Sequence, residues 1–127
     1  LGTFAVLAHA PGDFVGIQVG SNNAAPTAND VAMNTRIVHG IAATQLLYAG
    51  CEVELVTVAG GVATMIVRRY FTNKSGGNVT VREIGIYTTA GAGGLLWVFL
   101  ICRDSHADVV VADTELLRVQ YTITTTV

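Results

Sequence analysis

The chain has 127 residues and a mass of 13.3 kDa, a size that suits one domain with one hydrophobic core. Hydrophobic residues make up 51% and charged residues only 13% of it, where roughly 25% charged is usual in globular domains. The net charge is −2, Lys74 is the only lysine, and the longest apolar run, Ala92 to Cys102, is far shorter than a membrane-spanning helix. We therefore expect no nucleic acid and no membrane as partners, and we predict that part of the surface is buried against other subunits.

The first third of the chain predicts few regular elements. Residues 1–13 are a candidate extended N-terminal arm, and "FVGIQVG" at 14–20 alternates like a strand. The stretch "SNNAAPTAND" at 21–30 is rich in turn-forming residues. The residues that follow are compatible with one helical turn, which Asn29 or Asp30 would cap.

Two hairpins are predicted in the middle of the chain. Residues 51–55 alternate in polarity, and the turn signal "AGG" at 59–61 leads into the long strand pattern of residues 62–73. The turn formers of residues 73–78 then lead into "VTVREIGIY" at 79–87. We expect each turn to join two antiparallel neighbours, so that "FTNKSGGNVTVREIGIY" forms the central hairpin.

The strand at 79–87 contains a conflict of phase. Val79 and Val81 share one face of a regular strand, whereas Ile84 and Ile86 share the other. A β-bulge near Arg82 and Glu83 would bring both pairs to the same face. The neighbouring arginines at 68 and 69 must face opposite sides of their strand, so we expect one of them to point inward, to a carboxylate such as Glu83 or to a subunit contact.

The run "LLWVFLI" at 95–101 does not alternate, so a strand built from it must be covered on both faces, by the core and by a loop or a neighbouring subunit. A short strand at 109–111 and a regular final strand at 117–124 follow. Six to eight short strands separated by glycine-rich turns predict an all-β fold, an antiparallel β-sandwich of jelly-roll or immunoglobulin-like type, as a single domain over 1–127. The candidate subunit-interface residues are Leu95, Leu96, Trp97, Phe99 and Ile101.

The sequence contains no pattern that predicts catalysis or a cofactor. None of its three serines lies in a G-x-S-x-G elbow, and its three histidines lie in unrelated settings, so we expect a protein that is not an enzyme and has no catalytic or cofactor-binding residues. Asp104, His106 and Asp108 alternate and are the only candidate metal ligands, although a solvated acidic loop is the favoured interpretation.

Two other residue patterns bear on modification of the chain. Cys51 and Cys102 each lie in an apolar strand pattern, which favours free buried thiols over a disulfide. The triplets beginning at Asn73 and Asn78 both match the acceptor pattern for N-glycosylation, although two chance matches are unsurprising in a chain with so much Asn, Ser and Thr in its turns.

Four stretches together resemble a group of tailed-bacteriophage and prophage virion structural proteins, over about residues 14–125. They are "GIQVGSNNAAPTANDVAMNTRIVHG" at 16–40, "RRYFTNKSGGNVTVREIGIY" at 68–87, "FLICRD" at 99–104 and "LLRVQYTI" at 116–123. The resemblance implies a non-enzymatic component of the virion, an extracellular particle, such as a capsid decoration protein, a head fibre, or a neck or tail accessory protein. It implies further copies of the chain and other virion proteins, such as major capsid or tail proteins, as partners.

Two further hypotheses remain open from the sequence. The first is a carbohydrate- or receptor-binding module of a fibre, which exposed aromatic residues on a loop would favour, although Trp97 and the tyrosines lie in strand patterns. The second is a pilus-like subunit of an extracellular filament that donates a terminal strand, with which the threonine-rich end "TITTTV" is compatible.

Overall fold

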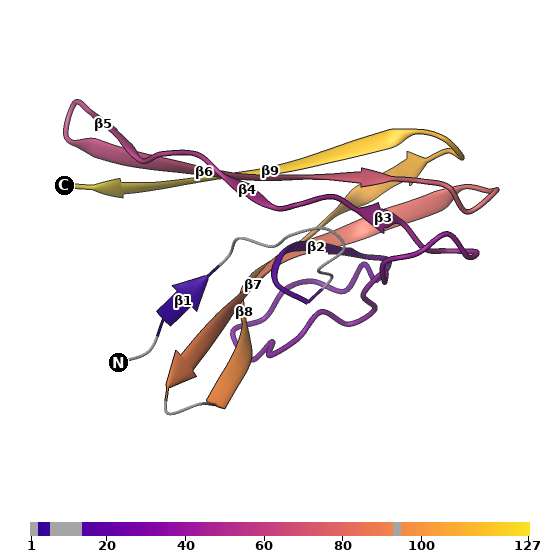
Figure 1. Cartoon of the computed structure of the whole chain (residues 1–127), viewed down its shortest axis with the longest axis horizontal. Coiled ribbons are helices and arrows are strands. Elements are labelled where there is room, and N and C mark those ends of the chain that lie inside the picture. Colours follow the sequence, from indigo (N-terminus) through magenta and orange to yellow (C-terminus); the bar gives the residue numbers. More distant parts are fainter. Residues whose placement is uncertain (1–2, 6–13, 93–94) are drawn as a thin grey trace.

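A computed structural model of the chain describes residues 3–5, 14–92 and 95–127 (Figure 1). These residues form nine strands and no helix, so the all-β prediction is confirmed. Every pairing between the strands is antiparallel. In this part of the chain there is no helix that could cross a membrane.

The first sheet is built around β7 (Val79–Ala92). β8 (Leu95–Val111) pairs with one edge of β7 along almost its whole length. On the opposite edge β1 (Thr3–Ala5) pairs with residues 89–91 and β2 (Gly16–Gly20) with residues 83–87. Among the described strands β8 has β7 as its only partner, so its second edge is open.

The second sheet is built around β6 (Val62–Thr72). β9 (Leu116–Thr126) pairs with all of it on one edge, and three short strands follow one another on the other edge. These are β3 (Leu47–Tyr48), β4 (Glu52–Val53) and β5 (Thr57–Ala59). The predicted hairpin into β6 is confirmed, and its turn uses the positive φ angles of Gly60 (57°) and Gly61 (75°).

The two sheets face each other as layers, which is consistent with a β-sandwich (Figure 1). They converge where β6 leads to β7 and β8 leads to β9, and they diverge toward the opposite end. Apolar side chains of both sheets form one core between them, comprising Ile17, Val19, Ile37, Leu46, Tyr48, Cys51, Val67, Phe71, Val79, Val81, Ile86, Val111 and Val119. Strands β6 to β9 are longer than the predicted short strands, with 11 to 17 residues each.

The hairpin predicted for "FTNKSGGNVTVREIGIY" is wrong. β6 belongs to the second sheet and β7 to the first, so residues 73–78 cross between the layers. Asn73 holds this corner from inside, because its fully buried Nδ2 donates to the carbonyl oxygens of Gly77 and Val111 at 2.7 Å each. Its backbone N–H also donates to Glu115 O at 2.9 Å, which joins the corner to the β8–β9 crossing beside it.

The predicted bulge is confirmed. The register between β7 and β8 shifts between Val81 and Glu83, where residues 106–108 of β8 lie opposite the single residue Arg82. As a result Val79, Val81, Ile84 and Ile86 all reach the core. The predicted helical turn is wrong, because the residues after position 28 form a loop in which Asp30 accepts hydrogen bonds from Thr27.

Candidate functional site

The distal part of β8 exposes large apolar side chains on both faces of its strand. Within this segment, Trp97–Ile101, which we call the apolar tip, the exposed fractions are 47% for Trp97, 44% for Val98, 46% for Phe99 and 57% for Ile101. Consecutive strand residues point to opposite faces, so neither face of the tip is covered by the rest of the described chain. The tip therefore lacks the cover on both faces that its sequence predicts it needs.

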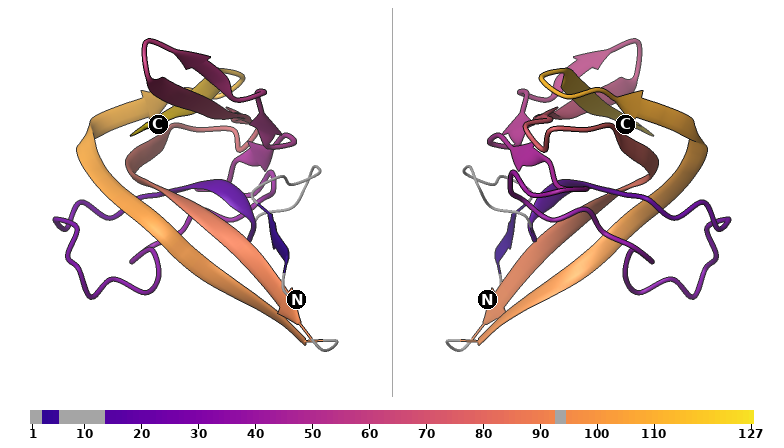
Figure 2. Two further views of the ribbon diagram at one scale, coloured as in Figure 1. Left: turned by 90° about the vertical axis from the view of Figure 1, so that its left-hand side faces the viewer. Right: turned by 90° about the vertical axis from the view of Figure 1, so that its right-hand side faces the viewer.

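The partners of the apolar tip on β7 explain its exposure. Trp97 lies opposite Ala90, Val98 opposite Thr89 and Phe99 opposite Thr88, and these small side chains shield little of their neighbours. Figure 2 shows the β7–β8 ribbon running away from the second sheet, so among the described residues the second sheet does not cover the distal end of this ribbon. Of the predicted interface residues, Trp97, Phe99 and Ile101 are exposed, whereas the side chains of Leu95 and Leu96 lie outside the described residues.

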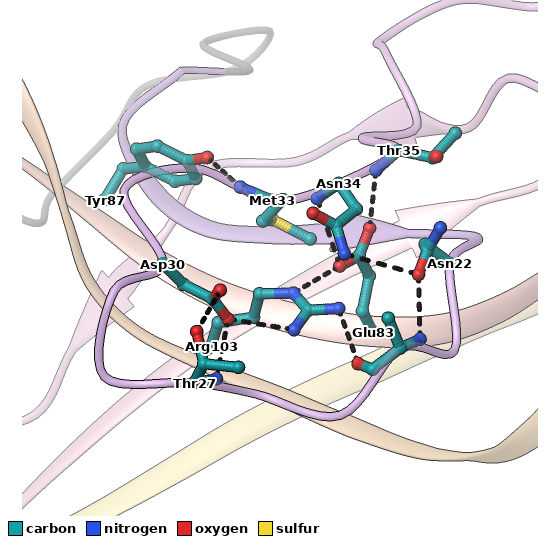
Figure 3. Close-up of polar contacts among 10 residues, drawn as sticks. Asn22, Thr27, Asp30, Met33, Asn34, Thr35, Glu83, Tyr87 and Arg103 are labelled. Carbon is teal, nitrogen blue, oxygen red and sulfur yellow. Dashed lines mark hydrogen bonds and ion pairs between the residues drawn. The ribbon is translucent and has the colours of Figure 1, made fainter.

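The proximal part of β8 has the opposite character, because it carries a buried ionic cluster. This cluster, which we call the ionic root, consists of Arg103, Glu83 and Asp30, and the side chains of Arg103 and Glu83 are 1% and 0% exposed. Arg103 Nε donates to Glu83 Oε2 at 2.6 Å and Nη1 donates to Asp30 Oδ2 at 3.1 Å (Figure 3). Its Nη2 donates to the carbonyl oxygen of Ala24 at 2.8 Å.

The ionic root binds residues 24–35 of the loop after β2 to the outer face of the first sheet. Glu83 Oε1 accepts a hydrogen bond from the backbone N–H of Thr35 at 2.9 Å. The hydroxyl of Tyr87 accepts one from the backbone N–H of Met33 at 2.7 Å (Figure 3). The loop therefore covers the outer face near the root through backbone groups, and it needs β7 and β8 side chains to do so.

Close packing under this loop explains the glycine at the end of β2. A Cβ atom at Gly20 would lie 2.3 Å from Glu83 Oε1 and 2.6 Å from Thr35 O. Real Cβ contacts do not approach so closely, so a side chain here would displace the Glu83 carboxylate or the loop backbone. Gly20 is thus part of the geometry of the ionic root.

Electrostatics at the ionic root favour the charged forms of Asp30 and Arg103. Hydrogen bonds from the backbone and hydroxyl of Thr27, with Arg103 beside it, hold the pKa of Asp30 below its ordinary value of 3.8. The hydrogen bond to Glu83 raises the pKa of Arg103. The cluster is therefore a charged anchor, and each of its three members already has a partner within the chain.

The inward-pointing arginine is not the one that pairs with Glu83. Arg68 and Arg69 do face opposite sides of β6, as predicted, and Arg69 is fully buried. Arg69 donates to the carbonyl oxygens of Ala49, Val15 and Ile17 at 2.6, 2.9 and 3.1 Å, and its guanidinium lies 4.8 Å from the centre of the Tyr48 ring. The inward-pointing arginine therefore binds backbone carbonyl oxygens and not the suggested carboxylate of Glu83, which pairs with Arg103.

The candidate metal ligands on β8 have separate partners. Asp108 accepts two hydrogen bonds from Arg82, at 2.7 and 3.0 Å, and Asp104 accepts one from the Tyr121 hydroxyl at 3.3 Å. The Nδ1 atom of His106 lies 2.7 Å from the carbonyl oxygen of Ala107. Within the described ranges no three acidic, histidine or cysteine side chains gather as a metal site would require.

The cysteines and asparagines noted in the sequence differ in access. Cys51 and Cys102 are both free thiols, as predicted, and burial raises the pKa of each. Asn73 is fully buried with its amide bonded, so the folded chain cannot present it to a glycosyltransferase, whereas Asn78 is exposed. A cavity of about 250 Å³ opens between the edges of β8 and β9 and is lined mostly by apolar side chains, including Val81, Val109 and Leu117.

Comparison of the chain with known proteins found no matching family model, no matching curated protein and no matching solved structure. In the part of the chain that the structure describes, the surface that most needs explanation is the apolar tip.

Proposed function

We propose that this protein is a non-enzymatic structural component of a virion that assembles through the surfaces of its β-sandwich, as a capsid decoration protein or a head or tail accessory protein. The observation that carries the proposal is the apolar tip, a strand segment with exposed apolar side chains on both faces. Exposed apolar surface of this kind marks a site of protein association. The sequence resemblance to phage virion proteins supplies the particle in which the association takes place.

The low charge of the chain favours an assembled state over a free monomer. Only 13% of its residues are charged, and some of these are committed to the buried ionic root. The segment from Ile84 to Cys102 contains neither a charged residue nor a proline, the residue types that usually protect exposed strand edges. An assembled state would cover this segment.

For the finer fold we propose a jelly-roll type. β6 pairs with β9 in one sheet while β7 pairs with β8 in the other, so the four long strands run as one long hairpin folded over itself. Such folds recur in viral capsid proteins, which agrees with the proposed role without establishing it.

Light scattering on the purified chain tests the assembly. We expect a defined oligomer or a polymer whose mass rises with concentration, and we expect Trp97→Asp to reduce it to a 13.3 kDa monomer. Leu55→Asp is the matched control, because Leu55 is 92% exposed but lies outside the apolar tip. A wild-type chain that stays monomeric at every concentration contradicts the proposal. Mass spectrometry of virions produced from the genome that encodes the chain tests its place in the particle.

A fibre module that binds carbohydrate is the second candidate, and the 47% exposure of Trp97 favours it. Aromatic side chains on an exposed strand face can stack on sugar rings, although here they are surrounded by aliphatic residues rather than polar ones. Binding to a glycan array by a monomeric protein would support this candidate. The filament hypothesis gains nothing from the structure, because residues 122–126 of β9 already pair with β6 of the same chain.

A further inference from the structure

We propose that two copies of this chain associate through their β8 strands, which pair antiparallel about a two-fold axis at Phe99. The inference rests on the proposed function, because it names the first contact of the assembly and its partner, a second copy. It starts from the open edge of β8, which has β7 as its sole partner among the described strands. An open edge presents unpaired N–H and C=O groups that another strand can pair with.

The distribution of charge along β8 selects the part of the edge that can pair. Arg103, Asp104 and Asp108 lie in its proximal half. The β7–β8 register is irregular at residues 106–108 and again at Ile101, so charge and not regularity separates the two halves. A two-fold axis at Asp104 would place two aspartates side by side, and like charges directly opposite are destabilising. The apolar tip has no charge and no such conflict, so the axis belongs there.

A two-fold axis at Phe99, the middle residue of the tip, pairs each apolar side chain with another. Trp97 then lies opposite Ile101 of the second copy, and Val98 lies opposite Leu100 of the second copy. Directly opposite residues share a face, so one face gains a row of aromatic and branched side chains and the other a row of aliphatic ones. Both exposed faces of the tip are thereby partly covered in a single step, and both open edges are satisfied because the contact is the same for each copy.

The chemistry of the tip favours a copy of itself as its occupant. A partner must be uncharged, extended, apolar on both faces and open along an edge. The tip combines these properties within a strand of 17 residues, whereas β5, another uncharged edge strand with exposed apolar residues, is three residues long. A neutral lipid surface or an unrelated apolar peptide would match the apolar faces but not the symmetry.

The exposed area of the tip sets the expected affinity of the dimer. Aromatic side chains bury about 150–250 Å² each, so the four half-exposed residues of the tip, together with the less exposed Leu100, offer on the order of 400 Å² per copy. This is about half of the roughly 800 Å² that each partner buries in a stable interface. We therefore expect a weak dimer with a dissociation constant in the micromolar range or above, which repeated contacts in a larger assembly would strengthen.

Cysteine cross-linking tests the register. The proposed axis brings the two Cα atoms of residue 99 to about 4.5–5.5 Å, within the range of about 4.4–6.8 Å that a disulfide spans. Because Phe99→Cys also removes apolar surface, the protein concentration is raised at least tenfold above that at which the wild-type chain associates, and we expect a disulfide-linked dimer under mild oxidation. The matched control is Val110→Cys, on the same strand and 52% exposed, which would have no counterpart within reach. The wild-type chain, which has Cys51 and Cys102, gives the background.

The outcomes separate this inference from the proposed function. A wild-type oligomer with efficient linkage at 99 and background linkage at 110 supports both. A wild-type oligomer in which 99 links no better than 110 overturns the β8 pairing and leaves the structural role standing. A wild-type chain that is monomeric at every concentration overturns both, and binding of that monomer to vesicles of neutral phosphatidylcholine would assign the tip to a lipid surface. Circular dichroism of each cysteine variant confirms that it is folded.

Discussion

The two halves of β8 differ in how their surfaces are covered. The proximal half carries Arg103 and is covered on its outer face by residues 24–35 of the loop after β2, which hydrogen bonds hold in place. The distal half carries Trp97 and Phe99 and has no such cover among the described residues. Both halves belong to one strand paired with β7. Their difference in exposure therefore comes from the segments that pack over them.

This contrast separates folding from association within one strand. The ionic root is buried and internally satisfied, so its residues should act on the stability of the isolated chain. The apolar tip is exposed, so its residues should act on contacts with other molecules and much less on stability. Substitutions in the ionic root should therefore lower stability, and substitutions in the apolar tip should lower association.

The largest expected effect comes from removing the cation of the ionic root. Arg103→Met leaves the fully buried carboxylate of Glu83 without its charged partner, which costs about 3–5 kcal/mol of unfolding free energy. Chemical denaturation measures the loss. Arg82→Met is the control, because Arg82 pairs with Asp108 at the surface between the same two strands, where solvent screens the interaction and its loss should change stability little. Equal losses from the two variants would show that the root is not a buried anchor.

A second large effect is expected at the glycine beneath the loop. Gly20→Ala forces a Cβ atom into the space of Glu83 and the Thr35 carbonyl, and overpacking of this kind costs about 1–3 kcal/mol. Gly77→Ala is the control, because nothing lies within 4 Å of a Cβ atom there. Thermal unfolding of both variants measures the difference. An unchanged unfolding temperature for Gly20→Ala would mean that the loop does not pack as described.

The tip should behave in the opposite way. Phe99→Ser removes a side chain that is 46% exposed and lies opposite Thr88, so we expect the unfolding free energy to fall by about 1 kcal/mol or less. The same change should lower self-association at least tenfold, measured by light scattering over a concentration series. A large loss of stability with unchanged association would assign Phe99 to the core and contradict the comparison.

The strand patterns of the sequence predicted much of the fold. The β5–β6 hairpin follows from the glycine turn, and the bulge follows from the phase conflict between Val81 and Ile84. The hairpin after Phe71 was wrong because turn-forming residues predict that the chain reverses but not whether it returns to the same sheet. The decisive contact is the buried side chain of Asn73, whose bond to Val111 joins positions 38 apart in the sequence.

The ionic root was missed because its members are far apart in the sequence and belong to no motif. Arg103 and Asp30 are separated by 73 positions, and only the loop brings them together. One signal was available: Glu83 and Arg103 are charged residues at the ends of an otherwise uncharged run, and buried charges of this kind need partners. The apolar character of the tip, in contrast, is visible in its sequence alone, because a segment apolar on both faces is recognisable without any contact. The sequence did not predict that the core would cover neither face of it.

The smallest predicted effect concerns the pH dependence of the loop anchor. The pKa of Asp30 lies below 3.8, mainly through hydrogen bonds from Thr27. A depressed pKa in the folded state means that the carboxylate contributes to stability above pH 3.8 and that this contribution is lost as the pH falls through the folded-state pKa. The backbone amide resonance of Thr27, which donates to Asp30 Oδ2 at 3.0 Å, should titrate with a midpoint below 3.8.

Asp30→Asn keeps a hydrogen-bond acceptor and removes the titrating group, so the Thr27 resonance should no longer change over that pH range. A midpoint above 3.8 in the wild-type chain would mean that Thr27 and Arg103 do not stabilise the charged form. Because the apolar tip has no titrating side chain between Trp97 and Ile101, acid should loosen the loop over the root while leaving the tip contact unchanged. Association that persists while the Thr27 resonance titrates would therefore show that self-association through the tip does not depend on the loop anchor at the ionic root.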